Sequence, residues 1–360
     1  MKNKYAYKII YSKKNIYVQE RHISKEILQN IYNQKFYNAL NRIEQKVPPI
    51  WMMRQAGRYH KHYQKLKEKY TFVELCKNPE LACEVTLGPV KDFDFDAAIL
   101  FSDILFPLDY IGMELKFDPG PIFKKKLDLE MITNFNIDNF ENYINFQSTA
   151  LSLIRRDLPK DKSLIGFTGG PLTLFHFAIR NNPIQEPLLE KSLPILKKLI
   201  EKNIQIQFQN DIDLLMIFDT EANSYSDIEF ESYVIPFLKN ITDKHPNKIG
   251  YFTKNISVKK FNKLKKIKNL KLTVLGQSQD IIKELEKTHL SLQGNFSNDL
   301  ITIEDSNIFS NHLNNYIEKC SENEVSSRTG WISSLDHGVK KTTPEANIHQ
   351  FIEKIRTKLS

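Results

Sequence analysis

Short apolar runs recur along the chain and predict buried β-strands. The runs are mostly continuous rather than alternating, as in strands that are covered on both faces of a parallel sheet. Helix-like windows, with apolar residues three and four positions apart, separate most of them. The predicted strands cover residues 50–53, 97–101, 164–168, 214–218, 248–252, 272–275, 290–293 and 330–333. The helical windows cover residues 72–90, 187–209, 230–242, 279–287 and 344–359, and the asparagine-rich stretch 134–145 predicts a surface loop.

Eight strands that alternate with helices predict an α/β fold, a single (β/α)8 TIM barrel. A doubly wound open sheet is the alternative. The positions that directly follow the predicted strands favour the barrel. Nearly all of them are polar or glycine, and a barrel gathers its chemistry at the carboxyl ends of its strands. They include Arg54, Asp103, Gly169, Gly170, Asp219, Thr220, Thr253, Gly294, Asn295, Asp336 and His337.

The composition is typical of a globular protein in a reducing compartment. Hydrophobic residues make up 41% and charged residues 26% of the 360 positions, which is close to the globular average. No apolar run approaches the ~18 residues that a membrane-spanning helix needs. The three cysteines, Cys76, Cys83 and Cys320, are too few and too scattered to predict a disulfide framework or a zinc site.

The formal net charge of +8 suits an acidic small substrate or nucleic acid. Because the lysines are dispersed and no aromatic-interleaved basic motif occurs, nucleic-acid binding is the weaker interpretation. Residues 1–19 hold five Lys and no acidic residue, with one Ser, no Arg and no long apolar segment. They predict a basic extension rather than a secretory signal. We expect this extension to cover residues 1–26, a catalytic domain to cover residues 27–360, and a cytoplasmic location, with organellar targeting as the alternative.

The most informative segment is M-R-Q-A-G-R-Y at residues 53–59, which places Arg54 and Arg58 directly after the first predicted strand. Arginine forks bind carboxylates in a bidentate geometry. The chain has nine Arg against forty-two Lys, so two Arg within five positions indicate a geometric requirement. The segment predicts a carboxylate clamp, and a solvated turn with incidental charge is the alternative.

Other strand ends offer further candidates, each with a structural alternative. Asp103 is a carboxylate inside an apolar run, so it is either a ligand-facing group or a helix N-cap. The G-F-T-G-G-P segment at 166–171 either lets the backbone approach a bulky ligand or forms a plain turn. His337 is either structural or part of the site. His60 and His62 are two positions apart, which does not favour a metal pair on a helix, and no zinc-hydrolase or serine-elbow motif occurs.

Four segments together resemble the uroporphyrinogen decarboxylase family. They are residues 53–59, the L-C-K-N-P-E-L-A segment at 75–82, the D-A-A-I-L-F-S-D-I-L segment at 96–105, and L-Q-G-N at 292–295. The resemblance runs from residue 48 to the C-terminus. It implies a (β/α)8 barrel that forms a homodimer and needs no metal or organic cofactor. It also implies the removal of four acetate carboxylates from uroporphyrinogen III, which gives coproporphyrinogen III.

The resemblance also implies roles for particular residues. The carboxylate of Asp103 would accept hydrogen bonds from the pyrrole NH groups and stabilise the developing cation. Arg54 would contact the reacting carboxylate and assist proton delivery, and Arg58 would hold peripheral carboxylates. Asp103 and Arg54 are thus the expected catalytic residues. The expected substrate-binding residues are Arg54, Gln55, Ala56, Gly57, Arg58, Asp103, Phe177, Thr220 and His337.

The chain departs from the family pattern at two places. Phe177 stands where the family has a substrate-contacting Tyr, and S-L-D-H-G at 334–338 replaces N-L-G-H-G. Asp336 adds a negative charge beside a site for a polyanion, which is unfavourable unless its side chain points away. These departures leave two alternatives open. One is a diverged barrel paralogue of the cobalamin-linked methyltransferase type, whose members usually bind zinc through His and Cys at strand ends. The other is a non-catalytic porphyrinogen-binding protein.

Overall fold

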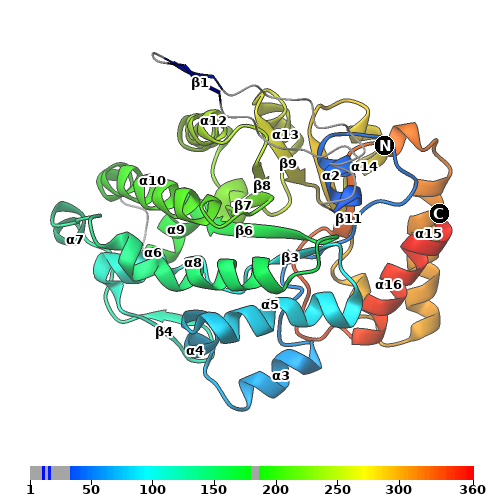
Figure 1. Cartoon of the computed structure of the whole chain (residues 1–360), viewed down its shortest axis with the longest axis horizontal. Helices are drawn as coiled ribbons and strands as arrows, with labels where there is room; N and C mark the ends of the chain where they lie inside the picture. The colour runs from blue at the N-terminus through cyan, green and yellow to red at the C-terminus, as the bar shows by residue number, and fades with distance from the viewer. Residues whose placement is uncertain (1–9, 13–14, 18–32, 180–185) are drawn as a thin grey trace.

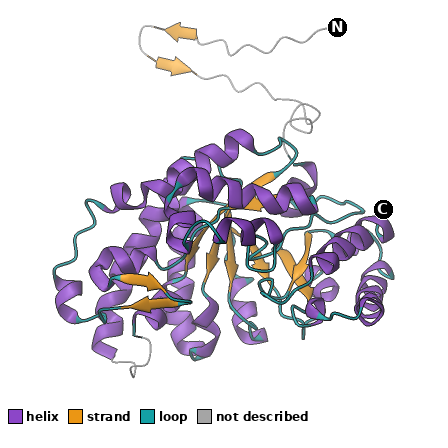
Figure 2. Cartoon of the chain, turned by 90° about the horizontal axis from the view of Figure 1, so that it is seen from below, coloured by secondary structure: helices purple, strands orange, loops and turns teal. Residues whose placement is uncertain are grey.

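A curled parallel sheet organises the protein. The computed structural model describes residues 10–12, 15–17, 33–179 and 186–360. Its sheet has seven strands in the order β11-β10-β9-β8-β7-β6-β3, and every neighbouring pair is parallel. The strands lie in the middle of the molecule with helices around them (Figure 2). They are β3 (Ala97–Ile99), β6 (Ser163–Gly169), β7 (Leu214–Phe218), β8 (Ile249–Phe252), β9 (Leu270–Val274), β10 (Ser291–Phe296) and β11 (Trp331–Leu335).

The first predicted strand, residues 50–53, is not a regular strand. It forms one parallel bridge, between Ile50 and Ser333. It nevertheless spans the gap between the two edges of the sheet: the Ser333 N–H donates to Pro49 O on one side, and the Asp96 N–H donates to Ile50 O on the other. The segment therefore takes the eighth position of a TIM-barrel-like fold. Pro49 has no N–H to donate, and Arg54 turns the chain with a φ of 61°, so too few residues remain for a ladder.

Helices follow most of the strands and cover the outside of the sheet (Figure 1). The longer ones are α5 (Pro79–Phe93), α8 (Phe140–Asp157), α10 (Glu186–Phe208), α12 (Ile235–Lys244), α15 (Ser306–Ser321) and α16 (Glu345–Lys358). The shorter ones are α2 (Gln34–Leu40), α3 (Lys61–Lys67), α4 (Phe72–Lys77), α6 (Phe106–Leu108), α7 (Leu129–Thr133), α9 (Pro171–Ala178), α11 (Asp227–Glu229), α13 (Val258–Leu264) and α14 (Ile281–Leu285).

Short turns and hairpins complete the described elements. The 3-10 turns are η2 (Thr220–Ser224), η4 (Leu300–Thr302) and η5 (Ser326–Arg328), and the π-helical turns are η1 (Asp109–Met113) and η3 (Phe230–Val234). Strands β4 (Leu115–Phe117) and β5 (Pro121–Phe123) form an antiparallel hairpin. Another hairpin, of β1 (Ile10–Ser12) and β2 (Asn15–Tyr17), lies within the predicted basic extension. The expected boundary between residues 26 and 27 falls outside the described residues.

The predicted helical windows are confirmed, with one division. The window 72–90 splits into α4 and α5 at Asn78, because Thr71 and Glu74 form a capping box at the start of α4 and Asn78 caps α5 ahead of Pro79. The prediction of a loop over residues 134–145 is wrong from Phe140 onward, where α8 begins. Its buried residues recur three and four positions apart, and that spacing outweighs the asparagines.

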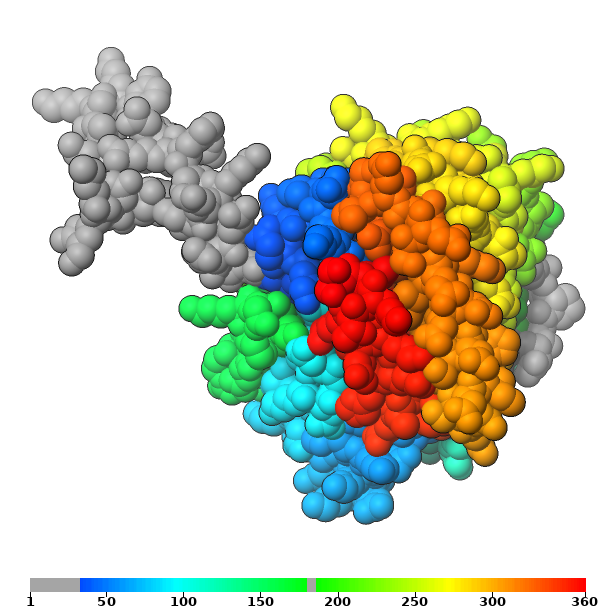
Figure 3. Space-filling view, turned by 90° about the vertical axis from the view of Figure 1, so that its right-hand side faces the viewer, coloured from blue at the N-terminus to red at the C-terminus, as the bar shows by residue number. Residues whose placement is uncertain are grey.

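The core lies between the sheet and the helices. Trp51, Trp331 and Tyr251 are among its largest fully buried side chains. The C-terminal α16 lies beside the first described residues of the body and beside α5 (Figure 3). Arg356 helps to hold α16 in this position, because its guanidinium contacts the carboxylates of Asp94 and Asp96. Within the described part of the chain, no helix combines the length and apolar character needed to cross a bilayer.

Candidate active site

The turn that carries the two arginines is fixed from behind by Gln55. This side chain is almost fully buried, accepts the Met52 N–H at 3.2 Å and donates to Ala97 O of β3 at 2.9 Å. The Tyr59 hydroxyl donates to Gln55 O at 2.7 Å. These bonds hold the turn against the sheet. Gln55 was expected to bind substrate. Its amide is occupied by the protein backbone, and its observed contacts are those of a support for the turn.

Arg54 and Arg58 both reach solvent, and the half-buried Ala56 and Gly57 lie between them. Protein atoms around Arg54 and the nearby charge of Arg58 lower the pKa of its guanidinium, and Asp103 partly offsets this effect. The stem of Arg54 lies against Gly338, where a Cβ would come within 2.7 Å of Arg54 Cδ. The loop after β11 therefore sets the direction of the Arg54 side chain.

Asp103 lies at the carboxyl end of the segment that follows β3. Its Oδ1 accepts the Leu105 N–H at 2.8 Å. Within the described residues, Oδ2 has neither a hydrogen bond nor an ion-pair partner within 4.0 Å. Burial raises the pKa of Asp103 to about 6, and the Leu105 bond and the nearby charge of Arg54 limit that rise. Asp103 does not cap α6, whose N-cap is Leu105 without a side-chain bond, so the helix-cap alternative does not describe it.

His337 follows β11, and the charge of Arg54 acts on it as well. Its ring lies edge-on to Phe252, with 5.3 Å between the ring centroids. The Gly338 N–H donates to Nδ1 at 2.6 Å, so a neutral ring carries its proton on Nε2. Burial and the charges of Arg54, Lys254 and Lys340 lower the pKa of His337 to about 4. At neutral pH this imidazole is therefore an uncharged donor.

A row of aromatic rings follows the strand ends and leads to His337. Phe167 of β6 contacts Phe218 of β7 at 5.6 Å, and Phe218 contacts Phe252 of β8 at 6.0 Å between centroids. Together with the Phe252–His337 contact, these rings form a continuous apolar row across the carboxyl edges of three neighbouring strands. Phe167 and Phe252 are buried and Phe218 is half-buried, so the row packs mainly against the protein and Phe218 is its most exposed ring.

The charge of Asp336 is directed into the protein framework. Its Oδ1 accepts the Asn298 N–H at 2.8 Å, so the carboxylate fixes the loop that follows β10. Its neighbour Ser334 lies on β11, where its hydroxyl accepts a hydrogen bond from the Gln293 amide at 3.0 Å. Ser334 and Asp336, the two substituted residues of the 334–338 segment, thus make local hydrogen bonds, and the Asp336 side chain bonds the loop after β10.

Thr220 and Phe177 come from the neighbouring segments after β7 and β6. Thr220 is half-buried and begins η2, and its carbonyl accepts the Lys254 N–H at 3.3 Å. Phe177 is half-buried in the last turn of α9 and packs on the core. Electrostatic contacts join Arg54, Arg58, Asp103 and His337, whereas no described contact joins Phe177 to that group.

Sequence reasoning did not select two cations near His337. Lys254 is exposed two residues after β8, and Lys340 is half-buried in the loop after β11, where it pairs with Asp299. Both charges act on His337. The strand-end rule that selected the other residues would also have found Lys254, because Thr253 was recognised as a strand end.

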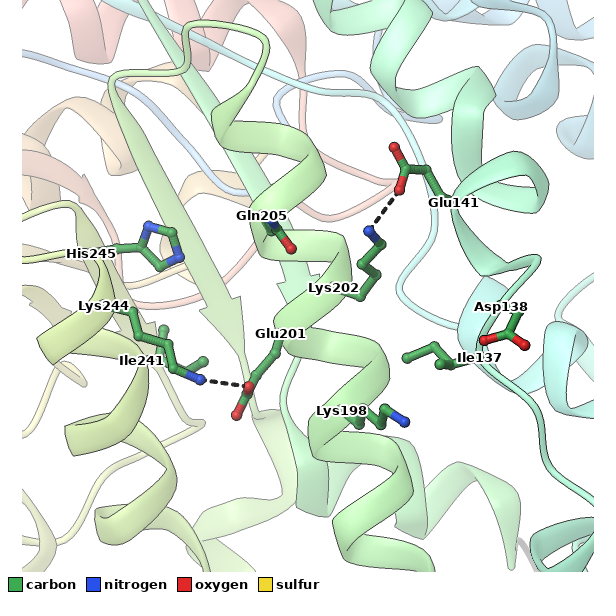
Figure 4. A pocket seen from close by; sticks show the side chains of 10 residues that line it. All are labelled: Ile137, Asp138, Glu141, Lys198, Glu201, Lys202, Gln205, Ile241, Lys244 and His245. Carbon is green, nitrogen blue, oxygen red and sulfur yellow. Dashed lines mark hydrogen bonds and ion pairs between the residues drawn. The ribbon is translucent and has the colours of Figure 1, made fainter.

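A separate hollow lies on the outer helices. It has a volume of about 670 Å³ and is lined mainly by side chains of α8, α10 and α12 (Figure 4). Its charges are mixed and largely paired: Lys202 bonds Glu141 at 2.6 Å, and Lys244 bonds Glu201 at 2.8 Å. Because this hollow is lined by the covering helices, it does not belong to the site at the strand ends.

The cysteines bear on the zinc-dependent alternative. Cys76, Cys83 and Cys320 are buried and free, and they lie on helices α4, α5 and α15 rather than on the segments that directly follow the strands. Burial and, to a smaller extent, the nearby charge of Asp103 raise the pKa of the Cys76 thiol. Among the described residues, no group of three or more His, Cys, Asp or Glu side chains has the arrangement of a metal site.

The family model and the curated relatives that match this chain name the same family. The family model described as "Uroporphyrinogen decarboxylase (URO-D)" matches residues 32–358. A uroporphyrinogen decarboxylase from Orientia tsutsugamushi is 33% identical over 344 residues, covering 89% of this chain and 98% of the relative. One from a Synechococcus strain is 31% identical and covers 86% and 93%. A solved structure of a methyltransferase from Methanosarcina mazei, 14% identical with a TM-score of 0.72 over 91% of this chain and 99% of that chain, shares the fold.

The matched range contains the arginine turn, Asp103, the glycine-rich turn and His337. The match also covers nearly the whole length of the curated relatives. The methyltransferase likeness concerns the fold alone, since its sequence identity is low. The chain belongs to the uroporphyrinogen decarboxylase family.

Proposed function

We propose that the protein removes the acetate carboxylates of uroporphyrinogen III to give coproporphyrinogen III. The observation that carries this proposal is the carboxylate of Asp103. One of its oxygens is fixed by the Leu105 N–H, and the other has no partner among the described residues, at a strand end shared with Arg54. An acceptor held in this way suits the pyrrole N–H groups of a porphyrinogen.

The chemistry uses the substrate as its own electron sink. Protonation of a pyrrole ring carbon makes the ring cationic, and Asp103 stabilises that charge through the N–H groups. The bond between the acetate methylene and its carboxylate then breaks, CO2 leaves, and the electron pair neutralises the ring. Proton transfer to the methylene carbon and loss of the ring proton leave a methyl group. Arg54 binds the reacting carboxylate and assists proton delivery to the ring.

The surrounding groups suit a substrate with eight carboxylates. Arg58 and Lys254 are exposed cations near Arg54 and His337, and they raise the local concentration of a polyanion. His337 adds a neutral Nε2–H donor, and the half-buried ring of Phe218 supplies an apolar contact for the macrocycle. The site thus combines a single anionic acceptor with peripheral cations.

An anaerobic assay tests the proposal. The purified protein is incubated with uroporphyrinogen III, and the products are separated by their number of remaining carboxylates. We expect the seven-, six- and five-carboxylate intermediates and then coproporphyrinogen. Asp103→Asn, at matched concentration and with an unchanged melting temperature, is the control with strongly reduced turnover. A folded wild-type protein that binds the substrate without releasing CO2 would contradict the proposal.

A non-catalytic porphyrinogen-binding protein is the second candidate, and Phe177 is the observation that favours it. The family's Tyr hydroxyl is missing at this position. Binding measured by fluorescence quenching, next to product analysis in the same sample, separates the two functions, because a binding protein would quench without forming product.

We also propose that the protein acts as a homodimer in the cytoplasm. Ile228 of α11 and Val258 of α13 are 77% and 63% exposed. The nearby Asp227 and Lys259 lie 3.9 Å apart, so the two apolar side chains belong to neighbouring segments after β7 and β8. Covering them in a dimer would remove this exposed apolar surface. Ile228→Asp should shift the mass in sedimentation from dimer to monomer, whereas Ile308→Asp, on α15, should not.

A further inference from the structure

The buried carboxylate of Asp219 is the group from which this inference starts. Asp219 directly follows β7 and is fully buried. Its Oδ1 accepts the Thr173 N–H at 2.7 Å, and its Oδ2 accepts the Tyr251 hydroxyl at 3.2 Å. Within the described residues no cation lies within 4.0 Å of it; Lys197 acts on it only from farther away. A buried carboxylate with neutral partners is costly, so a compensating role is expected.

Its first effect is on the start of α9. The N-cap of this helix is Gly170, which has no side chain and leaves the first N–H groups without a cap. Asp219 supplies the missing acceptor from another strand, because it accepts the N–H groups of Leu172 and Thr173. A carboxylate at this end also complements the helix dipole. Asp219 therefore caps the N-terminus of α9, although it lies on the segment after β7 and is far from α9 in the sequence.

The glycine-rich turn has its composition because of this arrangement. A Cβ at Gly170 would lie 2.2 Å from the Asp219 Cβ, so any side chain at position 170 would displace the cap. A Cβ at Gly169 would lie 3.1 Å from the Cβ of Ile104, the residue after Asp103. The turn therefore lies between Asp219 on one side and the Asp103 segment on the other. Close backbone packing, rather than a phosphate, explains these glycines.

The same group also reaches the segment that follows β7. The Thr173 hydroxyl accepts the Glu221 N–H at 3.0 Å, and the Ala222 N–H donates to Asp219 O at 2.9 Å. These bonds join the start of α9 to η2, which begins with Thr220. The carboxylate of Asp219 thus joins the start of α9 to the segment after β7, and Gly169 of the same turn packs against the segment after β3.

We propose that Asp219 is a positioning residue for the decarboxylation: it caps α9 in place of Gly170 and thereby holds the Asp103 segment, α9 and η2 in register around the substrate. The inference rests on the proposed function. It concerns a group that does not touch the substrate, so its effect should be on turnover more than on substrate affinity. Misplacing a reacting group by about 1 Å costs on the order of a hundredfold in rate.

The experiment compares Asp219→Ala and Asp219→Asn with a matched control, Asp305→Ala. Asp305 caps α15 by accepting the N–H groups of Asn307 and Ile308, and no described contact joins it to Arg54, Asp103 or His337. We expect Asp219→Ala to lower kcat by about tenfold to a hundredfold with KM within threefold. Asp219→Asn should restore most of kcat, because its amide oxygen still caps α9. Asp305→Ala should lower the melting temperature and leave both kinetic constants unchanged.

Hydrogen–deuterium exchange gives a readout that does not depend on activity. The amides of Leu172 and Thr173 should exchange faster in Asp219→Ala than in the wild type, and nearly normally in Asp219→Asn. If Asp219→Ala does not fold, Thr173→Val serves in its place, because it removes a hydroxyl that bonds both the Asp219 carboxylate and the Glu221 N–H. An Asp219→Ala protein with wild-type kcat, or a Thr173→Val protein with wild-type kcat where Asp219→Ala does not fold, overturns the inference. A wild-type protein without activity would instead overturn the proposed function. That result can be told apart from the two variant results, because both of them require an active wild-type protein.

Discussion

Gly338 holds Arg54 in place by having no side chain. The Arg54 stem occupies the volume in which a Cβ at position 338 would lie, 2.7 Å from Cδ and 3.0 Å from Cγ. The preceding residue is His337, and the next one, Val339, donates its N–H to Met53 O. The loop after β11 and the arginine turn are therefore one structural unit, although almost three hundred residues separate them.

Gly338→Ala should turn Arg54 away from Asp103 with little loss of stability. The guanidinium must move, because the new methyl group and the arginine stem cannot share the same volume. We expect kcat/KM to fall about tenfold or more, in line with the cost of a displaced reacting group. Gly120→Ala is the control, since a Cβ there has no neighbour within 4 Å. Wild-type kinetics in Gly338→Ala would refute the dependence of Arg54 on this glycine.

Asp103→Asn should abolish most of the turnover and leave the fold intact. The amide oxygen can still accept the Leu105 N–H, but the variant has no negative charge to stabilise a cationic pyrrole. We expect a loss in kcat of at least about a hundredfold, as for other groups that act on developing charge. Product analysis and circular dichroism together check this, and unchanged turnover would remove Asp103 from the mechanism.

The pH dependence of kcat/KM should have an acid limb set by Asp103. Burial raises the pKa of this carboxyl to about 6, and only the ionised form accepts two N–H groups. Activity should therefore be lost as the pH falls through about 6 and be full above it. The residual activity of Asp103→Asn should lack this limb. Because Arg54 lowers the Asp103 pKa, Arg54→Gln should move the limb to higher pH in its residual activity.

Lys254→Ala should weaken substrate capture without changing the chemistry. The ammonium is exposed near His337, so its attraction for substrate carboxylates is screened by salt. We expect KM to rise roughly two- to fivefold at low ionic strength, which corresponds to the free energy of one exposed ion pair, and kcat to stay unchanged. The difference from the wild type should shrink as NaCl is added. Lys259→Ala, whose ammonium lies 3.9 Å from Asp227 Oδ2, is the matched control.

Phe177→Tyr restores the hydroxyl found in the family. Because Phe177 is half-buried in the last turn of α9, the added group need not enter the core. We expect kcat/KM to rise about two- to tenfold, the value of one additional hydrogen bond. Phe175→Tyr on the same helix is the contrast, since its fully buried ring should cost stability instead. If Phe177→Tyr alters neither binding nor rate, the hydroxyl has no task in this chain.

Most of the sheet could be predicted from the sequence, because its strands are continuous apolar runs bounded by polar residues or glycine. The segment that closes the sheet, residues 50–53, was harder to predict. Residues 50–53 have the composition of a strand, but the preceding Pro49 and the left-handed Arg54 restrict them to a bridge with Ser333. That outcome depends on how two distant sheet edges meet, which no local pattern records.

The candidate site was predictable where a motif carried it and not where a distant contact did. Asp103 and His337 follow β3 and β11, Arg54 follows the closing segment, and the charge of Arg54 acts on both other groups. The hydrogen bonds of Gln55 to Met52 and Ala97 could not be foreseen, because the motif does not show that its amide faces the sheet. The cap that Asp219 provides for α9 likewise joins residues from different strands.

The segment at residues 49–53 is hydrogen-bonded to both edges of the sheet, and Arg54 follows it. Ile50 bonds Asp96 on one side, and Pro49 and Met53 accept bonds from Ser333 and Val339 on the other. A chain that has assembled its seven-stranded sheet but has not yet seated this segment would lack the arginine turn beside Asp103. Closure of the sheet and completion of the candidate site therefore depend on the same five residues.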